Sequence, residues 1–204
     1  AFVEGIIKFF IKKAAKIFLN IMGRGVGMFS IGDSIIYGSY GVCKIVGIKD
    51  MKVGEEVSSY YVLEPVFENN LTFYLPIGNE VIKEKMYHTL TTEEIYALIK
   101  AMPDEDTIWI ENDNERREHY KQILAGNDHT ALVKLIKTLH QRQQELKENG
   151  KKLYISDERF LKDAEKVLYD EFAHVLDIKQ EEVLPLIFEQ IEANERVRNE
   201  DSVM

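Results

Sequence analysis

The chain has 204 residues, 45% of them hydrophobic and 30% charged, which is typical of an ordinary soluble globular protein with one large or two small domains. Its net charge of −9 argues against indiscriminate binding to nucleic acid or anionic lipid. The single cysteine, Cys43, excludes an intrachain disulfide and fits a reducing, cytoplasmic environment.

The first 27 residues are basic and form a segment of their own. They carry five Lys or Arg and one Glu, and Ala1–Met22 has the pattern of a basic amphipathic helix. Three interpretations are open: a non-native or mis-started extension before Met28, a helix packed on the body, or a membrane-surface contact. We favour the first, because the Phe, Ile, Lys and Asn richness is what untranslated AT-rich DNA would encode. A membrane partner is therefore disfavoured.

Short strands separated by turn residues are predicted next. The strand segments are 29–37, 42–49, 58–64 and 71–76, with turns at Gly32-Asp33, around Gly54 and at Asn69-Asn70. Several short antiparallel strands in so few residues predict a strongly bent sheet or small barrel of the Tudor or SH3 kind over residues 28–90. Such folds leave an edge strand that a partner strand can extend.

Helices are predicted over the remainder of the chain. Thr91 and Glu94 form a capping box, and Pro103–Asp106 is typical of an exposed linker. Further helices are expected at Asp113–Ala125, after Asp128, from Ser156 and at Gln180–Ala193, followed by a polar tail that frays. The fold class is therefore α+β with two domains, in which an all-α domain at residues 91–204 follows the β domain.

Residues that could carry catalysis are missing from the pattern. The histidines have no Cys, His or carboxylate partner at metal-ligand spacing and are expected on helix surfaces; they are His88, His119, His129, His140 and His174. The cluster around Gly38 and Gly41 lacks the lysine of a phosphate-binding loop. The sequence therefore predicts a protein that is not an enzyme, with no metal, cofactor or small-molecule substrate.

A basic patch lies inside this acidic chain. Residues 116–152 carry nine Lys or Arg against four Asp or Glu, and several of the cations are one helical turn apart. These cations either form solvated helix faces or bind DNA phosphates, and Trp109 either packs in the core or stacks on unpaired bases. On the second interpretation the DNA-binding residues are Trp109, Arg116, Arg117, Lys121, Lys134 and Lys137.

Motifs in both halves resemble one known family. The first half reads Phe29-x-x-Gly32-Asp33-x-Ile35-Ile36-Tyr37-x-x-x-Gly41-Val42, then Tyr60-Tyr61-Val62-Leu63 and Leu71-Thr72-Phe73-Tyr74-Leu75-Pro76. The second half has Trp109, Ile123-Leu124-Ala125-Gly126-Asn127-Asp128 and Ile155-Ser156-Asp157-Glu158. In order and spacing these resemble the CarD/CdnL family of bacterial RNA polymerase-binding transcription regulators, whose β-module is shared with transcription-repair coupling factor.

The resemblance implies a regulator of transcription initiation with two partners. The β-module would bind the β subunit of RNA polymerase by edge-strand pairing, and the helical module would stabilise the promoter open complex, with Trp109 wedged against the splayed duplex. The polymerase-binding residues would be Tyr60, Tyr61, Val62, Thr72 and Tyr74. The alternative is a protein–protein adaptor that is anchored on polymerase and makes no direct contact with DNA.

Overall fold

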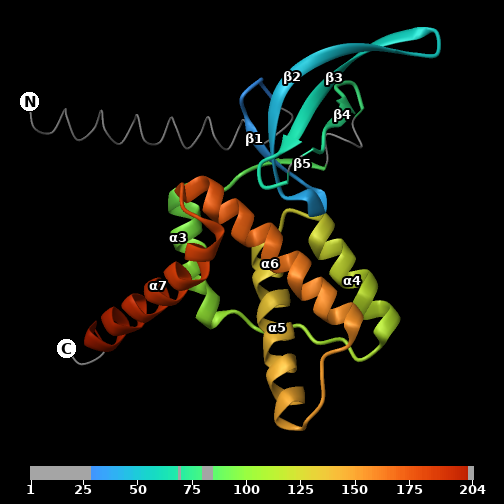
Figure 1. Cartoon of the computed structure of the whole chain (residues 1–204). Coiled ribbons are helices and arrows are strands. Elements are labelled where there is room, and N and C mark those ends of the chain that lie inside the picture. Colours follow the sequence, from blue (N-terminus) through green and yellow to red (C-terminus); the bar gives the residue numbers. More distant parts are fainter. Residues whose placement is uncertain (1–28, 69, 80–84, 202–204) are drawn as a thin grey trace, which may run out of the picture.

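Strands and helices follow one another along the chain in two blocks (Figure 1). The computed structural model describes residues 29–68, 70–79 and 85–201, so the extension predicted for residues 1–27 lies outside the described residues. The elements are β1 (Ser34–Tyr37), η1 (Gly38–Tyr40), β2 (Val42–Val53), β3 (Glu56–Pro65), β4 (Phe73–Pro76), β5 (Met86–His88), α3 (Thr92–Ala101), η2 (Met102–Asp104), α4 (Asp113–Ala125), α5 (His129–Glu148), α6 (Ile155–Leu176) and α7 (Gln180–Asp201).

The first block is one antiparallel sheet with the strand order β4-β3-β2-β1-β5. The predicted α+β class is confirmed. The strand β5 was missed, because three residues are too few to show an alternating pattern. The predicted strand from Phe29 begins only at Ser34, since Gly32 takes a φ of +100° in the turn before it.

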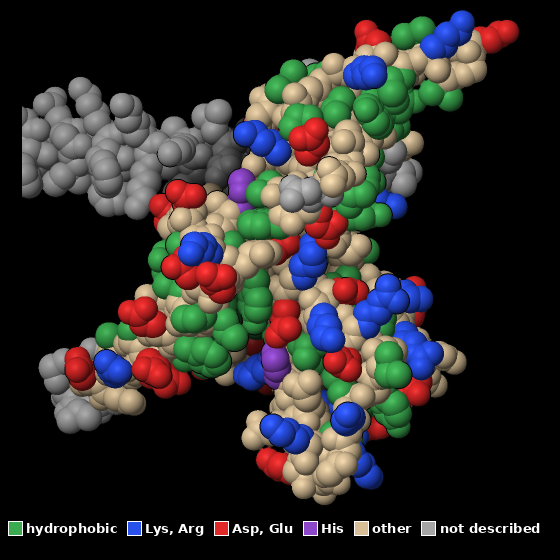
Figure 2. Space-filling view, in the orientation of Figure 1, with side chains coloured by type: hydrophobic (Ala, Val, Ile, Leu, Met, Phe, Trp, Pro, Cys, Tyr) green, Lys and Arg blue, Asp and Glu red, His purple; other side chains and the backbone are tan. Residues whose placement is uncertain are grey.

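The strands β2 and β3 are longer than the alternation alone indicated. Their ladder continues to Val53 paired with Glu56, and the turn between them has Gly54 at a φ of +69°. This hairpin projects beyond the rest of the sheet (Figure 1) and forms the narrow arm at the top of the space-filling view (Figure 2). Below the arm, one face of the sheet covers its own core, in which Ile35, Cys43 and Ile45 are fully buried.

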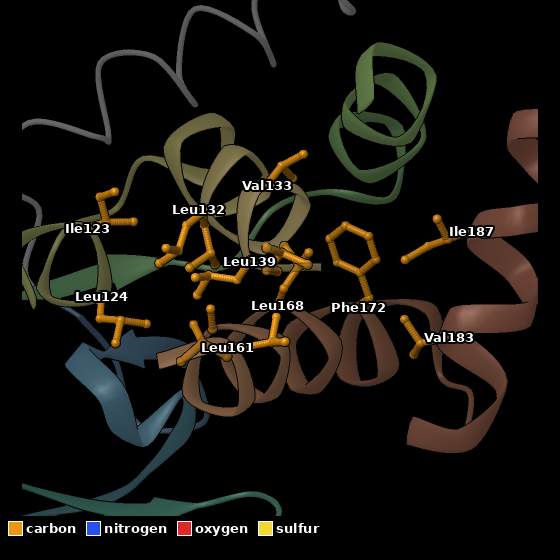
Figure 3. Packing of buried hydrophobic residues seen from close by; sticks show 14 of the residues in the cluster. Ile123, Leu124, Leu132, Val133, Leu139, Leu161, Leu168, Phe172, Val183 and Ile187 are labelled. Carbon is orange, nitrogen blue, oxygen red and sulfur yellow. The ribbon is translucent and has the colours of Figure 1, made fainter. Parts of the chain in front are cut away.

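The helical block closes around a second core. The predicted capping box is confirmed, because the Thr91 hydroxyl accepts the Glu94 N–H and the Glu94 carboxylate accepts the Thr91 N–H. Asp128 caps α5 as expected, accepting the Ala131 N–H at 3.0 Å. Apolar side chains of α5 and α6 interdigitate with α7 at one end (Figure 3), and the Phe172 ring lies fully buried between them.

The polar tail does not fray where the sequence predicted. Helix α7 continues from Gln180 to Asp201 instead of ending at Ala193. The reason is a contact that the local sequence does not reveal: the Arg198 guanidinium makes two hydrogen bonds, at 3.1 and 2.6 Å, with the Asp104 carboxylate of η2. This fork-to-fork geometry anchors the last turns to the body.

Helix α6 joins the two blocks, and we call its contact with the sheet and with Leu90 the joint. The Glu171 carboxylate is fully buried there. It accepts the Leu90 N–H at 2.7 Å and lies 2.6 Å from Nε2 of His129 at the start of α5. His174 lies 2.8 Å from the Ser34 hydroxyl of β1. Both histidines lie on helices, as expected, but the joint encloses most of each side chain, so neither is fully exposed at the surface.

The protonation of His129 should make stability depend on pH. Burial opposes its charge, but the hydrogen bond and charge of Glu171, with Asp128, outweigh burial and raise the pKa of His129 above its usual value. A raised pKa gives stability that is complete below about pH 6.5 and is lost as pH rises through the folded-state pKa. Urea midpoints of the protein should fall across that window, and His129→Gln should abolish the fall.

His174 provides the control of opposite sign. Burial and the nearby Lys44 lower the pKa of His174, so its share of stability is lost as pH falls from about 6.5 through the folded-state pKa. His174→Gln should flatten the acidic side of the same curve and leave the alkaline side unchanged. If both variants lower the stability equally at every pH, the two histidines stabilise the joint through hydrogen bonds and not through their protonation.

Candidate nucleic-acid and polymerase interfaces

Arg116, predicted as a phosphate contact, points into the protein. Only 1% of its side chain is exposed, because it lies on the face of α4 that also carries Tyr120 and Ile123. Its guanidinium bonds the Asp157 carboxylate at 3.1 Å, the Asp113 carboxylate at 2.7 Å and the backbone carbonyl of Ile110 at 2.8 Å. All its donor directions are engaged in the interior, so the structure does not present Arg116 to DNA.

This buried pair also sets the local pKa values. Burial acts to lower the pKa of Arg116, but the hydrogen bonds that its guanidinium donates to the Asp113 and Asp157 carboxylates outweigh burial, and the pKa is raised. Burial raises the pKa of the neighbouring Tyr120 phenol to about 12. The cluster is therefore charged but structural, and it ties the first turn of α4 to the first turn of α6.

Trp109 lies between two guanidinium groups. The Arg116 carbon Cζ is 4.4 Å from the centre of the indole ring and that of Arg142 is 4.9 Å away. The ring packs against the helical core, and its Nε1 is buried with no hydrogen-bond partner among the described residues. Of the two interpretations of Trp109, this placement supports a packing residue. It does not support a ring that is free to insert into DNA.

The two lysines predicted on α5 are also engaged with the protein. The Lys137 ammonium donates to the backbone carbonyls of Pro103 and Glu105 and lies 3.5 Å from that of Met102. Lys134 pairs with the Glu105 carboxylate at 3.2 Å and keeps 30% of its side chain exposed. Together they hold the segment after α3 onto α5, so the predicted linker, in which Asp104 and Asp106 are exposed, is also fastened to the body.

Arg117 and Lys121 are the exposed members of the predicted set. Both lie on the outer face of α4, and the only ion pair of Lys121 within the described residues is a long one of 3.6 Å to Glu118. They line an open hollow of about 820 Å³ between η1, α4 and the start of α6, which we call the inter-module groove. Figure 2 shows Lys and Arg side chains gathered on this side of the molecule, over α4.

Two further cations reach the inter-module groove from distant parts of the sequence. Lys85 comes from the segment before β5 and Arg159 from α6, while Asp163 is the one acidic residue that lines the hollow within the described part of the chain. The sequence alone did not reveal them, since neither belongs to the run of closely spaced cations. Tyr40 of η1 adds an aromatic wall and is 43% exposed. The groove is thus a concave surface of positive charge with apolar walls.

The predicted polymerase contacts lie on β3 and β4. The sheet has two edges, β4 and β5, so of the two candidate edge strands, Tyr60–Leu63 and Leu71–Leu75, the second lies at an edge as β4, whereas the first belongs to β3, which lies between β2 and β4. Tyr61 is a core residue, only 3% exposed, so its side chain is not on the surface where a polymerase contact would be made. The other predicted contacts lie outside the core. In the β3–β4 ladder Tyr74 pairs with Val62 and Tyr60 pairs with Pro76, and Thr72 is exposed just before β4.

The hydrogen-bonding pattern shows which groups of β4 are free. The Ile77 N–H donates to the Ser59 carbonyl at 3.0 Å, so Ile77 and Ser59 form a hydrogen-bonded pair of the ladder. Because such pairs alternate in antiparallel sheets, Leu75 and Phe73 also bond β3, and the N–H and carbonyl of Tyr74 point to the open side. Pro76 has no N–H, so Tyr74 supplies the donor within β4 for an added strand.

The described residues form neither a metal site nor a helix that could span a membrane. Across residues 29–68, 70–79 and 85–201, no three His, Cys, Asp or Glu side chains come together as metal ligands. Among the described helices, none combines the length and apolar character that crossing a bilayer requires. What the structure offers is an open sheet edge on one module and a cationic hollow beside it, which together define a binding protein.

Comparison with known families agrees with this class. Residues 29–81 match the model of the CarD-like/TRCF RID domain, and residues 94–188 match that of the CarD C-terminal domain. None of the curated proteins matches the chain. The chain belongs to the CarD/CdnL family, which comprises transcription regulators that interact with RNA polymerase and is not a family of enzymes.

Mutation of the adjacent residues Arg116 and Arg117 should change the free energy of unfolding by very different amounts. Arg116→Ala leaves Asp157 buried without its partner, which costs about 3–5 kcal/mol of unfolding free energy. Arg117→Ala removes an exposed side chain and should change stability by about 0.5 kcal/mol or less. Urea unfolding of both variants measures the difference. Equal, small losses would contradict the inward placement of Arg116.

Proposed function

We propose that the protein is a cytoplasmic regulator of transcription initiation that binds the RNA polymerase β subunit and stabilises the promoter open complex. The observation that supports this proposal is the presence of two unlike surfaces on one chain, whose two modules are in contact through α6. The free edge of β4 lies on the sheet, and the cationic inter-module groove lies between η1, α4 and the start of α6. Each surface suits one partner.

The β4 edge supports binding to a protein strand. Tyr74 presents its backbone N–H and carbonyl outward, and its ring, 44% exposed, lies 5.9 Å from the Lys49 ammonium. Backbone pairing supplies affinity in such contacts, while the side chains on the adjoining face supply specificity. Tyr60, Val62 and Tyr74 would therefore contact the β subunit, with Thr72 at the rim.

The exposed cations support contact with promoter DNA. Arg117 and Lys121 would bind phosphates directly, and Lys134 would contribute through its exposed part. Arg116, Lys137 and Trp109 would act as supports, because their polar or aromatic groups are engaged inside the protein. Since phosphate contacts do not read bases, sequence preference should be weak. With a net charge of −9, binding would depend on delivery by polymerase.

The adaptor alternative has one observation in its favour. Four of the five cations in the predicted DNA-binding set are paired with carboxylates or carbonyls of the protein itself, although the pair of Lys121 with Glu118 is long and exposed. An adaptor would use the helical module to bind another protein and would leave open complexes insensitive to salt-dependent phosphate contacts. The salt experiment below separates the two functions.

Tyr74→Pro tests the polymerase contact at a single hydrogen bond. Proline removes the outward donor of β4 but leaves the β3–β4 ladder intact, because the Tyr74 N–H takes no part in it. Binding of the full-length variant to the β subunit, measured by biolayer interferometry, should fall at least tenfold. Tyr74→Ala keeps the donor and should lose less. Unchanged binding of Tyr74→Pro would rule out pairing at this edge.

Arg117→Ala and Lys121→Ala test the DNA contact. Each lost phosphate contact should lower the slope of log affinity against log salt by roughly one, equally on different promoters. The measurement is open-complex lifetime with polymerase at several salt concentrations. Lys179→Ala, just before α7 and with 75% of its side chain exposed, is the matched control. An unchanged slope in the double variant would favour the adaptor.

A further inference from the structure

An apolar cleft lies between η2, α5, α6 and α7, and it shares no lining residue with the inter-module groove. Its floor is closed to water, since Val133, Ile136 and Leu168 are each at most 9% exposed. Leu184 and Phe188 of α7 form a wall and are 42% and 59% exposed. The hollow has a volume of about 420 Å³. We call it the α7 cleft.

Helix α7 carries more apolar surface than the described chain covers. Val183 and Ile187 are buried in the helical core. Leu184, Phe188 and Ile191 recur at the spacing of one helical turn and place a second apolar strip beside the buried one. A strip wide enough for two neighbours therefore has one neighbour within the described residues, and exposed apolar strips of this kind mark interaction sites.

The chemistry of the α7 cleft suits apolar side chains better than a polar small molecule. Among its described lining residues, the side chains with nitrogen are Lys137 and His140. The Lys137 ammonium already donates to the Pro103 carbonyl at 2.9 Å, and Nε2 of His140 lies 2.7 Å from the Glu165 carboxylate. Neither is free to orient a polar ligand, whereas an apolar trough between helices accepts the apolar face of another helix.

Negative charge borders the α7 cleft. Helix α7 carries seven Asp or Glu and two Arg, a net charge of −5, and Figure 2 shows acidic side chains over it beside hydrophobic ones. Glu192 and Glu195 are exposed, and each follows a cleft residue of α7 by one turn. Arg196 lies 3.4 Å from Glu192, but both side chains are exposed, so this pair is weak. A basic partner is favoured, while a second copy would set two acidic α7 helices together.

We propose that the α7 cleft binds an amphipathic helix of a partner protein, with apolar side chains at i, i+4 and i+7 and with Lys or Arg beside them. The apolar face packs on Leu184 and Phe188, and the cations pair with Glu192 and Glu195. This inference goes beyond the proposed function and does not depend on it, because the cleft is separate from the β4 edge and from the inter-module groove.

The test titrates the full-length protein into a fluorescein-labelled helical peptide made of Leu and Lys, with Leu along one face, and follows fluorescence anisotropy. A matched peptide of Leu and Glu has the same apolar face and the opposite charge. The Lys peptide should bind at least about tenfold more tightly than the Glu peptide, and its binding should weaken with salt. Equal binding of the two peptides would overturn the choice of a basic partner.

Phe188→Ser should weaken binding of the Lys peptide at least about tenfold, because an exposed wall of the cleft is lost. Leu184→Ser should act in the same direction. Both residues are exposed, so both variants should melt close to the parent protein, which a thermal scan checks. Val197→Ser is the matched control, since Val197 is 57% exposed and lies on the opposite side of α7 from Phe188. It should leave binding unchanged.

Charge is tested separately from the apolar wall. The double variant Glu192→Gln and Glu195→Gln should weaken the Lys peptide several-fold and reduce the salt dependence of its binding. Unchanged binding of the Lys peptide to Phe188→Ser would place it on the acidic surface at large and overturn the inference.

Other occupants of the cleft give different results. A parent protein that dimerises in sedimentation equilibrium, with a monomeric Phe188→Ser variant, would make the α7 cleft a contact between copies. A chain begun at Met28 that binds the Lys peptide far more tightly than the full chain would assign the cleft to residues 1–27. Either result would overturn the partner helix.

Discussion

The position of each binding surface relative to the other depends on one buried carboxylate, that of Glu171. Its two oxygens engage Leu90, at the end of the sheet module, and His129, at the start of α5. A buried charge is tolerated only when it is fully bonded, so the sheet module cannot swing away without leaving the carboxylate unpaired. The contacts of Glu171 therefore help to hold the sheet module, with its open edge, against the helical module.

A second buried charge pair organises the groove from within. Arg116 and Asp157 join α4 to α6 across the interior, and the Arg116 guanidinium also supports the Trp109 ring. The pair adds little net stability when compared with apolar residues of the same shape, because both charges lose their hydration. The pair instead holds the first turn of α6 against α4, and this contact helps to fix the position of the exposed Ile155.

Much of the fold could be predicted from local chemistry, because caps, turn glycines and apolar periodicity act within a few residues. Helix α4 is an instructive failure. Arg116, Tyr120 and Ile123 recur at helical spacing, so the sequence did contain the signal that Arg116 faces inward, but a cation next to Arg117 was taken for part of a basic patch. The joint, the Arg198 anchor on Asp104 and the groove cation Arg159 join distant segments, and no local pattern encodes them.

The short edge of β4 also bears on self-association. Open sheet edges attract strands of other copies, and long flat ones seed aggregates. Here the strand has four residues and Pro76 removes a donor from its outer side, so a ladder started at Tyr74 cannot lengthen along the strand. Backbone hydrogen bonds alone are then too few to bind an unrelated strand tightly. A lasting partner must also match the side chains on the sheet face, which makes discrimination among partners a property of that face and guards the protein against polymerising with itself.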